Sequence, residues 1–176
     1  MKIGIDISQT MYGNTGVGEY LLNLICSIVT SNTKNKYILF FSSFRRRVPK
    51  EVLRLESQTV TIKTFPFPSV FLHIIWNIFH IIPIEKFIGD IDVFITSDWT
   101  EPPAKRAKKA TIIYDLVVYK FPKETDRKIV SVQRKKLQWV KKESDVIFCI
   151  SESTKKDVAE VLGVDKKRLT VLYPGR

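Results

Sequence analysis

The sequence KIGIDISQTMYGNTGVGEYLLNLICSIV (residues 2–29) joins an apolar strand, a glycine-containing loop and an amphipathic helix. We expect the strand over residues 2–7 and the helix over residues 17–30, where apolar side chains recur with a helical period. This strand-to-helix step is repeated along the chain. Apolar segments that favour strands follow at 36–41, 59–65, 92–96, 111–115, 145–151 and 169–172.

Helical segments separate these strands. A short helix is expected over 50–56, a charged helix over 124–142 and a further helix over 153–162. Ser151 or Ser153 can cap the last of these, and Gly163 is well placed to end it. The alternation predicts an α/β fold, with a Rossmann-like open parallel sheet and helices on both of its faces.

The composition fits one globular domain with a strongly basic surface. The chain has 176 residues, 44% of them hydrophobic, and a net charge of +11. Such a charge favours a polyanionic partner such as a phosphate, a nucleic acid or an anionic membrane. We interpret each basic cluster as a solvated loop or helix end. The clusters are Arg45–Arg47, Lys105–Lys109, Arg134–Lys136, Lys141–Lys142 and Lys166–Arg168.

The two cysteines, Cys26 and Cys149, each lie within an apolar run, and we expect both to be buried and reduced. The sequence has no CxxC pair, and His73 and His80 alone do not make a metal site. We therefore expect no metal and no resident cofactor. The first residues lack the long apolar region of a signal peptide, so a reducing, cytoplasmic compartment is favoured.

Residues 65–84 form an uncharged, strongly apolar segment, FPFPSVFLHIIWNIFHIIPI. Its length approaches that of a membrane span, but Pro66, Pro68 and Pro83 limit the helix to about 14 residues. A helix in the protein core or at a membrane surface is favoured over a span. Basic clusters elsewhere in the chain would help to hold such a helix to anionic lipid.

The loop GNTGVG (13–18) leads from the first strand into the first helix. Glycine lets backbone N–H groups approach an anion at a helix N-terminus, so we interpret the loop as a phosphate or sugar site. The alternative is a tight turn that needs positive φ angles. The spacing G-x-x-G-x-G differs from the dinucleotide pattern G-x-G-x-x-G, which disfavours NAD.

Several polar residues follow the strands at what should be one edge of the sheet. Asp115 ends the strand at 111–115, where parallel sheets bind ligands, although it can equally cap the next turn. Asp98 and Glu101 follow the strand at 92–96, and either bind hydroxyls or solvate a loop. Ser151 and Glu152 follow the strand at 145–151. The sequence has no Ser-His-Asp order, no GxSxG elbow and no Walker motif.

Four segments in this order resemble the N-terminal domain of family 4 retaining glycosyltransferases, which have the two-domain GT-B fold. The segments are IGIDISQTMYGNTGVGEYLLNLI (3–25), IIWNIFHIIPIEKFIGDIDVFITSDWTEPP (74–103), TIIYDLVVYKFPKET (111–125) and ISESTKKDVAEVLGVDKKRLTVLYPG (150–175). The resemblance implies an acceptor-binding domain over residues 1–173 and the start of an interdomain linker at 174–176. It implies that a C-terminal domain, absent from this sequence, binds most of the nucleotide-sugar donor.

The resemblance also implies roles for individual residues. Gly16, Val17 and Gly18 are expected near the donor diphosphate, and Tyr114 and Asp115 near the transferred sugar. The acceptor cleft is expected to include Asp98, Glu101, Ser151 and Glu152. The family often has His where this chain has Tyr114. With an ordinary pKa near 10, tyrosine is the poorer base at neutral pH.

Taken together, the sequence predicts the acceptor-binding half of a retaining glycosyltransferase that moves a hexose-type sugar to a lipid-linked or polysaccharide acceptor. We expect it to be inactive alone, and to work with a separate donor-domain chain or as a homodimer. An anionic membrane surface is a further expected partner. The alternative is a non-catalytic α/β module that binds a phosphate ligand or a protein. Nucleic-acid binding is disfavoured because aromatic residues do not interleave with the basic clusters.

Overall fold

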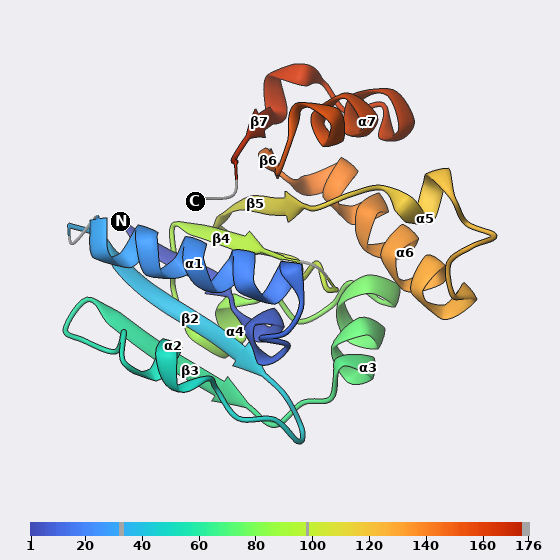
Figure 1. Cartoon of the computed structure of the whole chain (residues 1–176). Coiled ribbons are helices and arrows are strands. Elements are labelled where there is room, and N and C mark those ends of the chain that lie inside the picture. Colours follow the sequence, from blue (N-terminus) through green and yellow to red (C-terminus); the bar gives the residue numbers. More distant parts are fainter. Residues whose placement is uncertain (32–33, 98, 174–176) are drawn as a thin grey trace.

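The computed structural model describes residues 1–31, 34–97 and 99–173, and within them one seven-stranded sheet forms the centre of the molecule (Figure 1). All strand pairs are parallel, and the strand order is β3-β2-β1-β4-β5-β6-β7. The predicted Rossmann-like fold is therefore confirmed. The strands are β1 (Lys2–Asp6), β2 (Lys36–Ser42), β3 (Val60–Phe65), β4 (Val93–Thr96), β5 (Lys108–Ile113), β6 (Val146–Cys149) and β7 (Leu169–Val171).

The strands are connected by helices and short helical turns. Two of the longer helices have caps of the expected kind: Asp126 accepts a hydrogen bond from Lys128 N at 2.7 Å, and Ser151 accepts one from Thr154 N at 3.0 Å. Gly163 ends the last α-helix in the left-handed conformation. The elements are η1 (Ser8–Met11), α1 (Gly16–Ser31), α2 (Lys50–Leu53), α3 (Ser69–Leu72), η2 (His73–Ile78), α4 (Glu85–Ile88), α5 (Val117–Lys120), α6 (Arg127–Glu143), α7 (Glu152–Leu162) and η3 (Lys166–Arg168).

The sheet is buried on both faces, with alternate residues of each strand facing opposite sides. Ile5, Leu39 and Ile112 pack beneath α1 and α2 on one face. On the other face, Phe40 and Phe94 pack against η2 and α4, while α6 and α7 cover β5 and β6. Cys149 is buried in this second core, as predicted, whereas Cys26 on α1 is only half-buried.

The first face is less completely covered at the β6 end of the sheet. Phe148 and Ile150, which face the α1 side, are only partly buried, whereas Ile147 and Cys149 on the opposite side are fully buried. In Figure 1, α1 crosses the face over β1, β2 and β4, while α7 lies well away from it. Apolar surface therefore lies beside α1 at this end.

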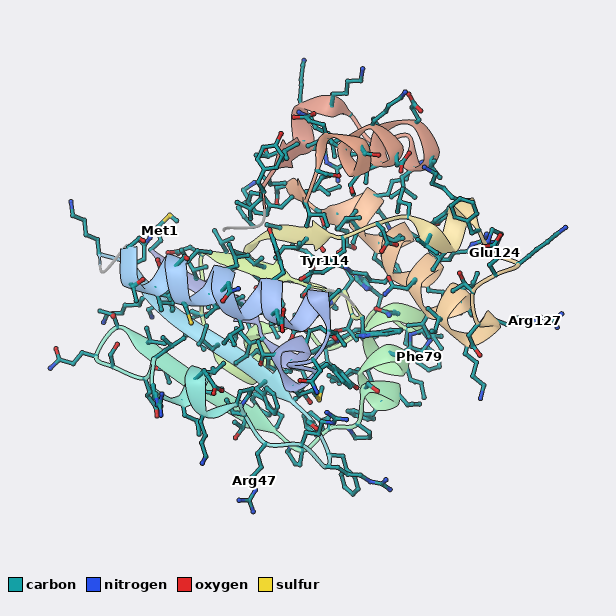
Figure 2. All side chains as sticks on the ribbon, viewed as in Figure 1. Met1, Arg47, Phe79, Tyr114, Glu124 and Arg127 are labelled. Atoms are coloured by element: carbon teal, nitrogen blue, oxygen red, sulfur yellow. The ribbon has the colours of Figure 1, made fainter. Side chains whose placement is uncertain are left out.

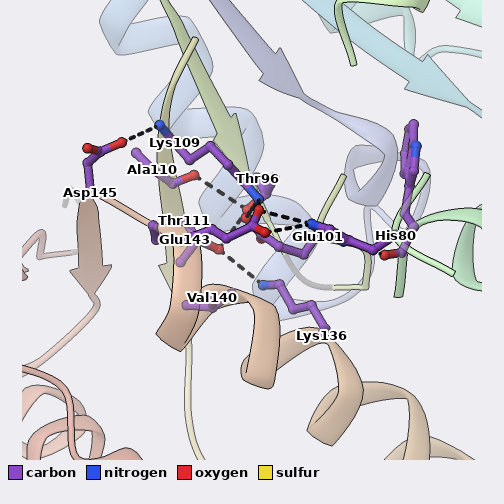
Figure 3. A network of polar contacts seen from close by, with 12 residues as sticks. His80, Thr96, Glu101, Lys109, Ala110, Thr111, Lys136, Val140, Glu143 and Asp145 are labelled. Carbon is purple, nitrogen blue, oxygen red and sulfur yellow. Dashed lines mark hydrogen bonds and ion pairs between the residues drawn. The ribbon is translucent and has the colours of Figure 1, made fainter. Parts of the chain in front are cut away.

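A buried ion pair joins β5 to the loop that precedes it. Lys109 Nζ lies 3.0 Å from Glu101 Oε1 and 2.9 Å from Glu143 Oε2, and the Lys109 side chain is only 5% exposed. Glu101 also accepts a hydrogen bond from the Thr96 hydroxyl at 2.6 Å, and Glu143 contacts His80 (Figure 3). The network ties the β4–β5 loop, the end of α6 and the segment after η2 together.

Two lysines from the basic clusters are therefore buried, which corrects the interpretation of those clusters as solvated. Besides Lys109, Lys136 is almost wholly buried, and its ammonium group donates hydrogen bonds to Ser97 O and Thr111 Oγ1. Lys136 lies four residues before the buried Val140, on the face of α6 that packs against the sheet. In the sequence, the helical spacing between Lys136 and Val140 is hard to see because Lys136 belongs to a run of basic residues.

The segment 65–84 is not one continuous helix. It forms α3 and the π-helical turn η2 and then breaks, because His80 and Ile82 have positive φ angles of 52° and 61°. Leu72, Ile75 and Trp76 are buried, so the core interpretation is confirmed for one side of the segment. Among the described residues no helix is long and apolar enough to cross a membrane.

Some local predictions differ from the structure at element ends. The expected strand 145–151 is shorter, ending at Cys149, and the strand at 111–115 begins three residues earlier, at Lys108. The expected helix 124–142 begins at Arg127 because Asp126 caps it. The short helices α4 and α5 were not predicted, since each spans only four residues and contains no helical period.

The Lys109 ion pair generates a stability prediction with a built-in control. Lys109→Met should lower the free energy of unfolding by about 3–5 kcal/mol, because it leaves the Glu101 carboxylate buried without its cation. Lys108→Met removes a neighbouring ion pair with Asp145, but that lysine side chain is 75% exposed. It should change the free energy by less than about 1 kcal/mol. Urea unfolding followed by circular dichroism measures both, and equal losses would contradict the assignment.

Candidate active site

The N-terminus of α1 presents backbone donors at the carboxyl edge of the sheet. Thr15 caps the helix, because its hydroxyl accepts a hydrogen bond from Gly18 N at 3.1 Å. Within the described residues, the N–H groups of Gly16 and Val17 make no hydrogen bond, as expected for the first turn of a helix. These two donors and the helix dipole form an anion-binding geometry.

The glycines of this loop serve different purposes. None of Gly13, Gly16 and Gly18 has a positive φ angle, so the alternative of a turn that needs positive φ is wrong. A Cβ at Gly18 would lie 2.4 Å from Tyr12 O, which shows that the loop carbonyl packs directly on this residue. A Cβ at Gly16 would meet nothing within 4 Å. Gly18 is therefore required for packing, and Gly16 leaves space above the helix end.

Tyr114 and Asp115 follow β5 at the same edge. The Tyr114 hydroxyl lies 3.0 Å from Ser97 Oγ, and its ring meets Tyr20 of α1 edge-on, with centroids 5.5 Å apart. Asp115 is exposed, and its Oδ1 accepts a hydrogen bond from Val117 N at 2.9 Å. The predicted turn-capping role of Asp115 is confirmed. That bond occupies one carboxylate oxygen and fixes the orientation of the other.

Two neighbouring cavities meet at these residues. A largely apolar cavity of about 750 Å³ lies between α1, the end of β6 and the residues after β7, and includes Tyr20, Leu24 and Leu172. A second cavity of about 270 Å³ lies between β5 and α6, and includes Trp99 and Gln133. Both are lined by Val17, Tyr114 and Asp115. Figure 2 shows Tyr114 between α1 and β5.

A buried carboxylate lies close to this edge. Asp6 ends β1 and lines a third cavity of about 160 Å³ with Ser8, Gln9 and Trp99. Burial raises the pKa of Asp6, although the hydrogen bonds from Ser8 and the positive charge of Lys136 act in the opposite direction. Trp99 lines both this cavity and the second one, so these two cavities are neighbours.

The other predicted site residues are not brought to these cavities. Glu101 is fully buried in its ion pair with Lys109, and its carboxylate does not face the cleft. Ser151 serves as the cap of α7, and Glu152 lines a separate hollow on that helix with Lys155 and Lys166. Asp98 lies outside the described residues, as do residues 174–176.

Sequence reasoning missed several residues that line the cavities. Tyr20, Trp99, Gln133 and Lys136 come from segments that appeared to be core, loop or solvated helix. For Lys136, its spacing from Val140 was the signal that could have revealed it. For Trp99 no such signal exists, because its position depends on the Asn77 side chain, which donates to Trp99 O at 2.9 Å.

The arrangement suits the transfer of a group attached to a phosphate. Backbone N–H groups on Gly16 and Val17 can hold phosphate oxygens, and the Asp115 carboxylate across the same space can accept a hydrogen bond from a hydroxyl. The larger cavity has the size of a small-molecule site. Within the described residues, no three His, Cys, Asp or Glu side chains gather as metal ligands.

Comparison with known protein families gives a match over most of the chain. The family model described as glycosyltransferase family 4 matches residues 15–176, which include the helix end at Gly16, the Tyr114–Asp115 pair and the last strand. No curated protein matches the chain.

The two glycines at the start of α1 provide a matched pair of substitutions. Gly18→Ala should lower the free energy of unfolding by about 1–3 kcal/mol, because its methyl group would overlap the Tyr12 carbonyl. Gly16→Ala should change it by less than about 0.5 kcal/mol, since the space around it is empty. Thermal and urea unfolding provide the comparison. A Gly16→Ala variant as unstable as Gly18→Ala would contradict this description of the loop.

Proposed function

The chain belongs to glycosyltransferase family 4, and on this premise we propose that it is the acceptor-binding half of a retaining glycosyltransferase. In this proposal residues 1–173 form the N-terminal domain of a GT-B enzyme. The reaction moves a hexose-type sugar from a nucleotide-sugar to a lipid-linked or polysaccharide acceptor. A second domain, in the same or another chain, binds most of the donor.

One observation carries the proposal: Val17, Tyr114 and Asp115 line both the 750 Å³ and the 270 Å³ cavity. An anion-binding helix end and a carboxylate therefore border the same space. A transfer reaction needs this juxtaposition, because the leaving phosphate and the attacking hydroxyl must both reach one carbon atom. A domain that only binds phosphate would not need the carboxylate there.

The residues take distinct parts in this reaction. The N–H groups of Gly16 and Val17 donate to the diphosphate, which gains negative charge as its bond to the sugar breaks. Asp115 accepts a hydrogen bond from the acceptor hydroxyl and orients its oxygen toward the anomeric carbon. The Tyr114 hydroxyl contacts the buried Ser97 and is therefore turned toward the interior. We assign Tyr114 the role of positioning Asp115.

The surroundings of the site favour an acceptor with apolar as well as polar parts. Tyr20, Leu24 and Leu172 give the 750 Å³ cavity an apolar wall, whereas Gln133 and Lys136 border the smaller one. A glycan attached to lipid combines these properties. We place the protein in the cytoplasm, where the free thiols of Cys26 and Cys149 remain reduced.

Transfer of radiolabelled sugar tests the proposal. The chain is incubated with membrane extract and a panel of nucleotide-sugars, both alone and with a family 4 donor domain. We expect transfer only in the mixture. There, Asp115→Asn should reduce the rate by about 10- to 100-fold, the value of one charge-assisted hydrogen bond.

Ser153→Ala is the control for that variant, because Ser153 is exposed on α7 and lines none of the three cavities. It should retain the full rate. If the two proteins associate and the mixture still transfers no sugar, the chain is better described as a non-catalytic phosphate-binding or protein-assembly module. Turnover by the chain alone would disprove the need for a second domain.

A further inference from the structure

The outer side of the segment formed by α3, η2 and the following turn is covered with apolar side chains. We call Val70, Phe71, Ile74, Ile78, Phe79 and Ile81 the apolar ridge; each is between 38% and 66% exposed. Val70, Ile74 and Ile78 recur every four residues, so they share one side of the helical segment. The buried Leu72, Ile75 and Trp76 occupy the other side, which accounts for the anchoring of the segment.

The backbone after η2 is held in a strained form that keeps the end of the ridge in place. His80 and Ile82 have positive φ angles, which are unfavourable for a β-branched residue such as Ile82. Side chains stabilise the turn: Trp76 Nε1 donates to Ile82 O at 2.9 Å, and His80 Nδ1 lies 2.8 Å from Trp76 O. The His80 ring also stacks on Trp139, with centroids 3.6 Å apart. The fold therefore exposes Phe79 and Ile81 on a fixed support.

Basic side chains lie beside one end of the ridge. Helix α6 runs next to η2, where Trp139 Nε1 donates to Asn77 O at 2.9 Å. Lys142 on this helix lies 4.9 Å from the centre of the Trp139 ring, the ring on which His80 stacks. Lys141 is not part of this group, because a Cβ at Gly163, at the end of α7, would lie 3.7 Å from its Nζ. Lys135 lies near His73, and burial together with this positive charge lowers the pKa of His73.

A second basic group lies beside the other end. The loop after β2 carries Arg45–Arg47, all exposed, together with Phe44, which is 67% exposed. This loop adjoins the start of α3, because Ser42 Oγ donates to Phe67 O at 3.0 Å. Residues 66–84 contain no Asp or Glu. The surface is thus apolar along its middle and positively charged at both ends.

This distribution matches an anionic lipid bilayer, in which apolar chains lie beneath negatively charged headgroups. The six described side chains of the ridge are all apolar, so they offer no directional hydrogen bonds to a protein partner of opposite charge. The absence of a membrane-spanning helix from the described residues fits contact at the bilayer surface. We propose that the apolar ridge inserts into an anionic membrane, with Lys135, Lys142, Arg45 and Arg47 contacting the headgroups.

The surface lies close to the candidate active site. Asn77 of η2 donates to Trp99 O, and Trp99 lines the cavities beside Asp6 and Asp115. In Figure 1, α3 lies beyond the arrowheads of the sheet, and Figure 2 shows Phe79 on the same side of the molecule as Arg127. Docking through the ridge would therefore bring the cavities to the membrane, where a lipid-linked acceptor resides. This last consequence rests on the proposed function; the docking itself does not.

Flotation with lipid vesicles tests the docking. The chain should float with vesicles that contain phosphatidylglycerol, and at least about tenfold less with pure phosphatidylcholine, since each basic residue near the surface contributes about fivefold. Added salt should weaken the binding. The Phe79→Ser, Ile81→Ser double variant should bind about tenfold less or weaker still. Both side chains are at least half exposed, so the variant should fold normally.

Matched controls separate the ridge from general apolar or basic surface. Leu53→Ser with Val161→Ser removes two similarly exposed apolar residues from α2 and α7 and should leave binding unchanged. Lys135→Gln with Lys142→Gln should weaken binding, whereas Lys155→Gln with Lys156→Gln on α7 should have less effect. The assignment of this surface would be overturned if a control variant on α2 and α7 lost as much vesicle binding as the matched ridge or lysine variant.

Other outcomes are also decisive. If the chain ignores anionic vesicles and instead forms a dimer that the Phe79→Ser, Ile81→Ser variant abolishes in sedimentation velocity, the ridge is an interface between copies. Sugar transfer without vesicle binding would overturn the docking and leave the proposed function intact. Vesicle binding without sugar transfer in any mixture would overturn the proposed function and leave the docking intact.

Discussion

The buried ammonium group of Lys109 is the constraint on which the surroundings of the site depend. A buried cation is costly unless polar partners compensate it, and for Lys109 two carboxylates from different segments, Glu101 and Glu143, do so. Through Glu143, the network reaches His80 and the strained turn after η2. Burial alone would raise the pKa of Glu143, but the hydrogen bonds from Lys109 and His80 outweigh it and lower the pKa. Glu143 therefore stays ionised as the network requires.

This network has a consequence for the carboxyl edge of the sheet. The β4–β5 loop begins beside the cavities at Trp99 and is anchored at Glu101, whose backbone N–H donates to the Asn77 side chain. One side chain of η2 therefore holds both ends of this short stretch, because Asn77 also bonds Trp99 O. The cavity wall at Trp99 and the apolar ridge are built from the same packed unit. The candidate site and the ridge can thus keep a fixed relation to each other.

The sequence predicted which residues come together where backbone position alone matters. Gly16, Val17 and Asp115 line one cavity because they follow strands of a parallel sheet, whose carboxyl ends meet at one edge. It failed at Glu101, because an acidic residue in a loop gives no sign that it pairs with a buried lysine. That partner, Lys109, lies eight residues further along the chain, in β5. It also failed to place Ser151 and Glu152, where helix capping takes precedence over the cleft. Long-range side-chain pairing decided each of these cases.

The amino-acid sequence by itself determined the fold class, the order of the strands and longer helices along the chain, and the helix N-terminus at the glycine loop. Those features arise from local periodicity, turn chemistry and the parallel sheet that alternation requires. Only the tertiary structure decided which lysines are buried, that Tyr114 and Asp115 border two cavities, and that segment 65–84 divides into a buried and an exposed side. The physical reason is that burial depends on contacts between residues far apart in the chain. Lys108 and Lys109 are neighbours in sequence, yet the pleat of β5 sends one to water and the other to Glu101.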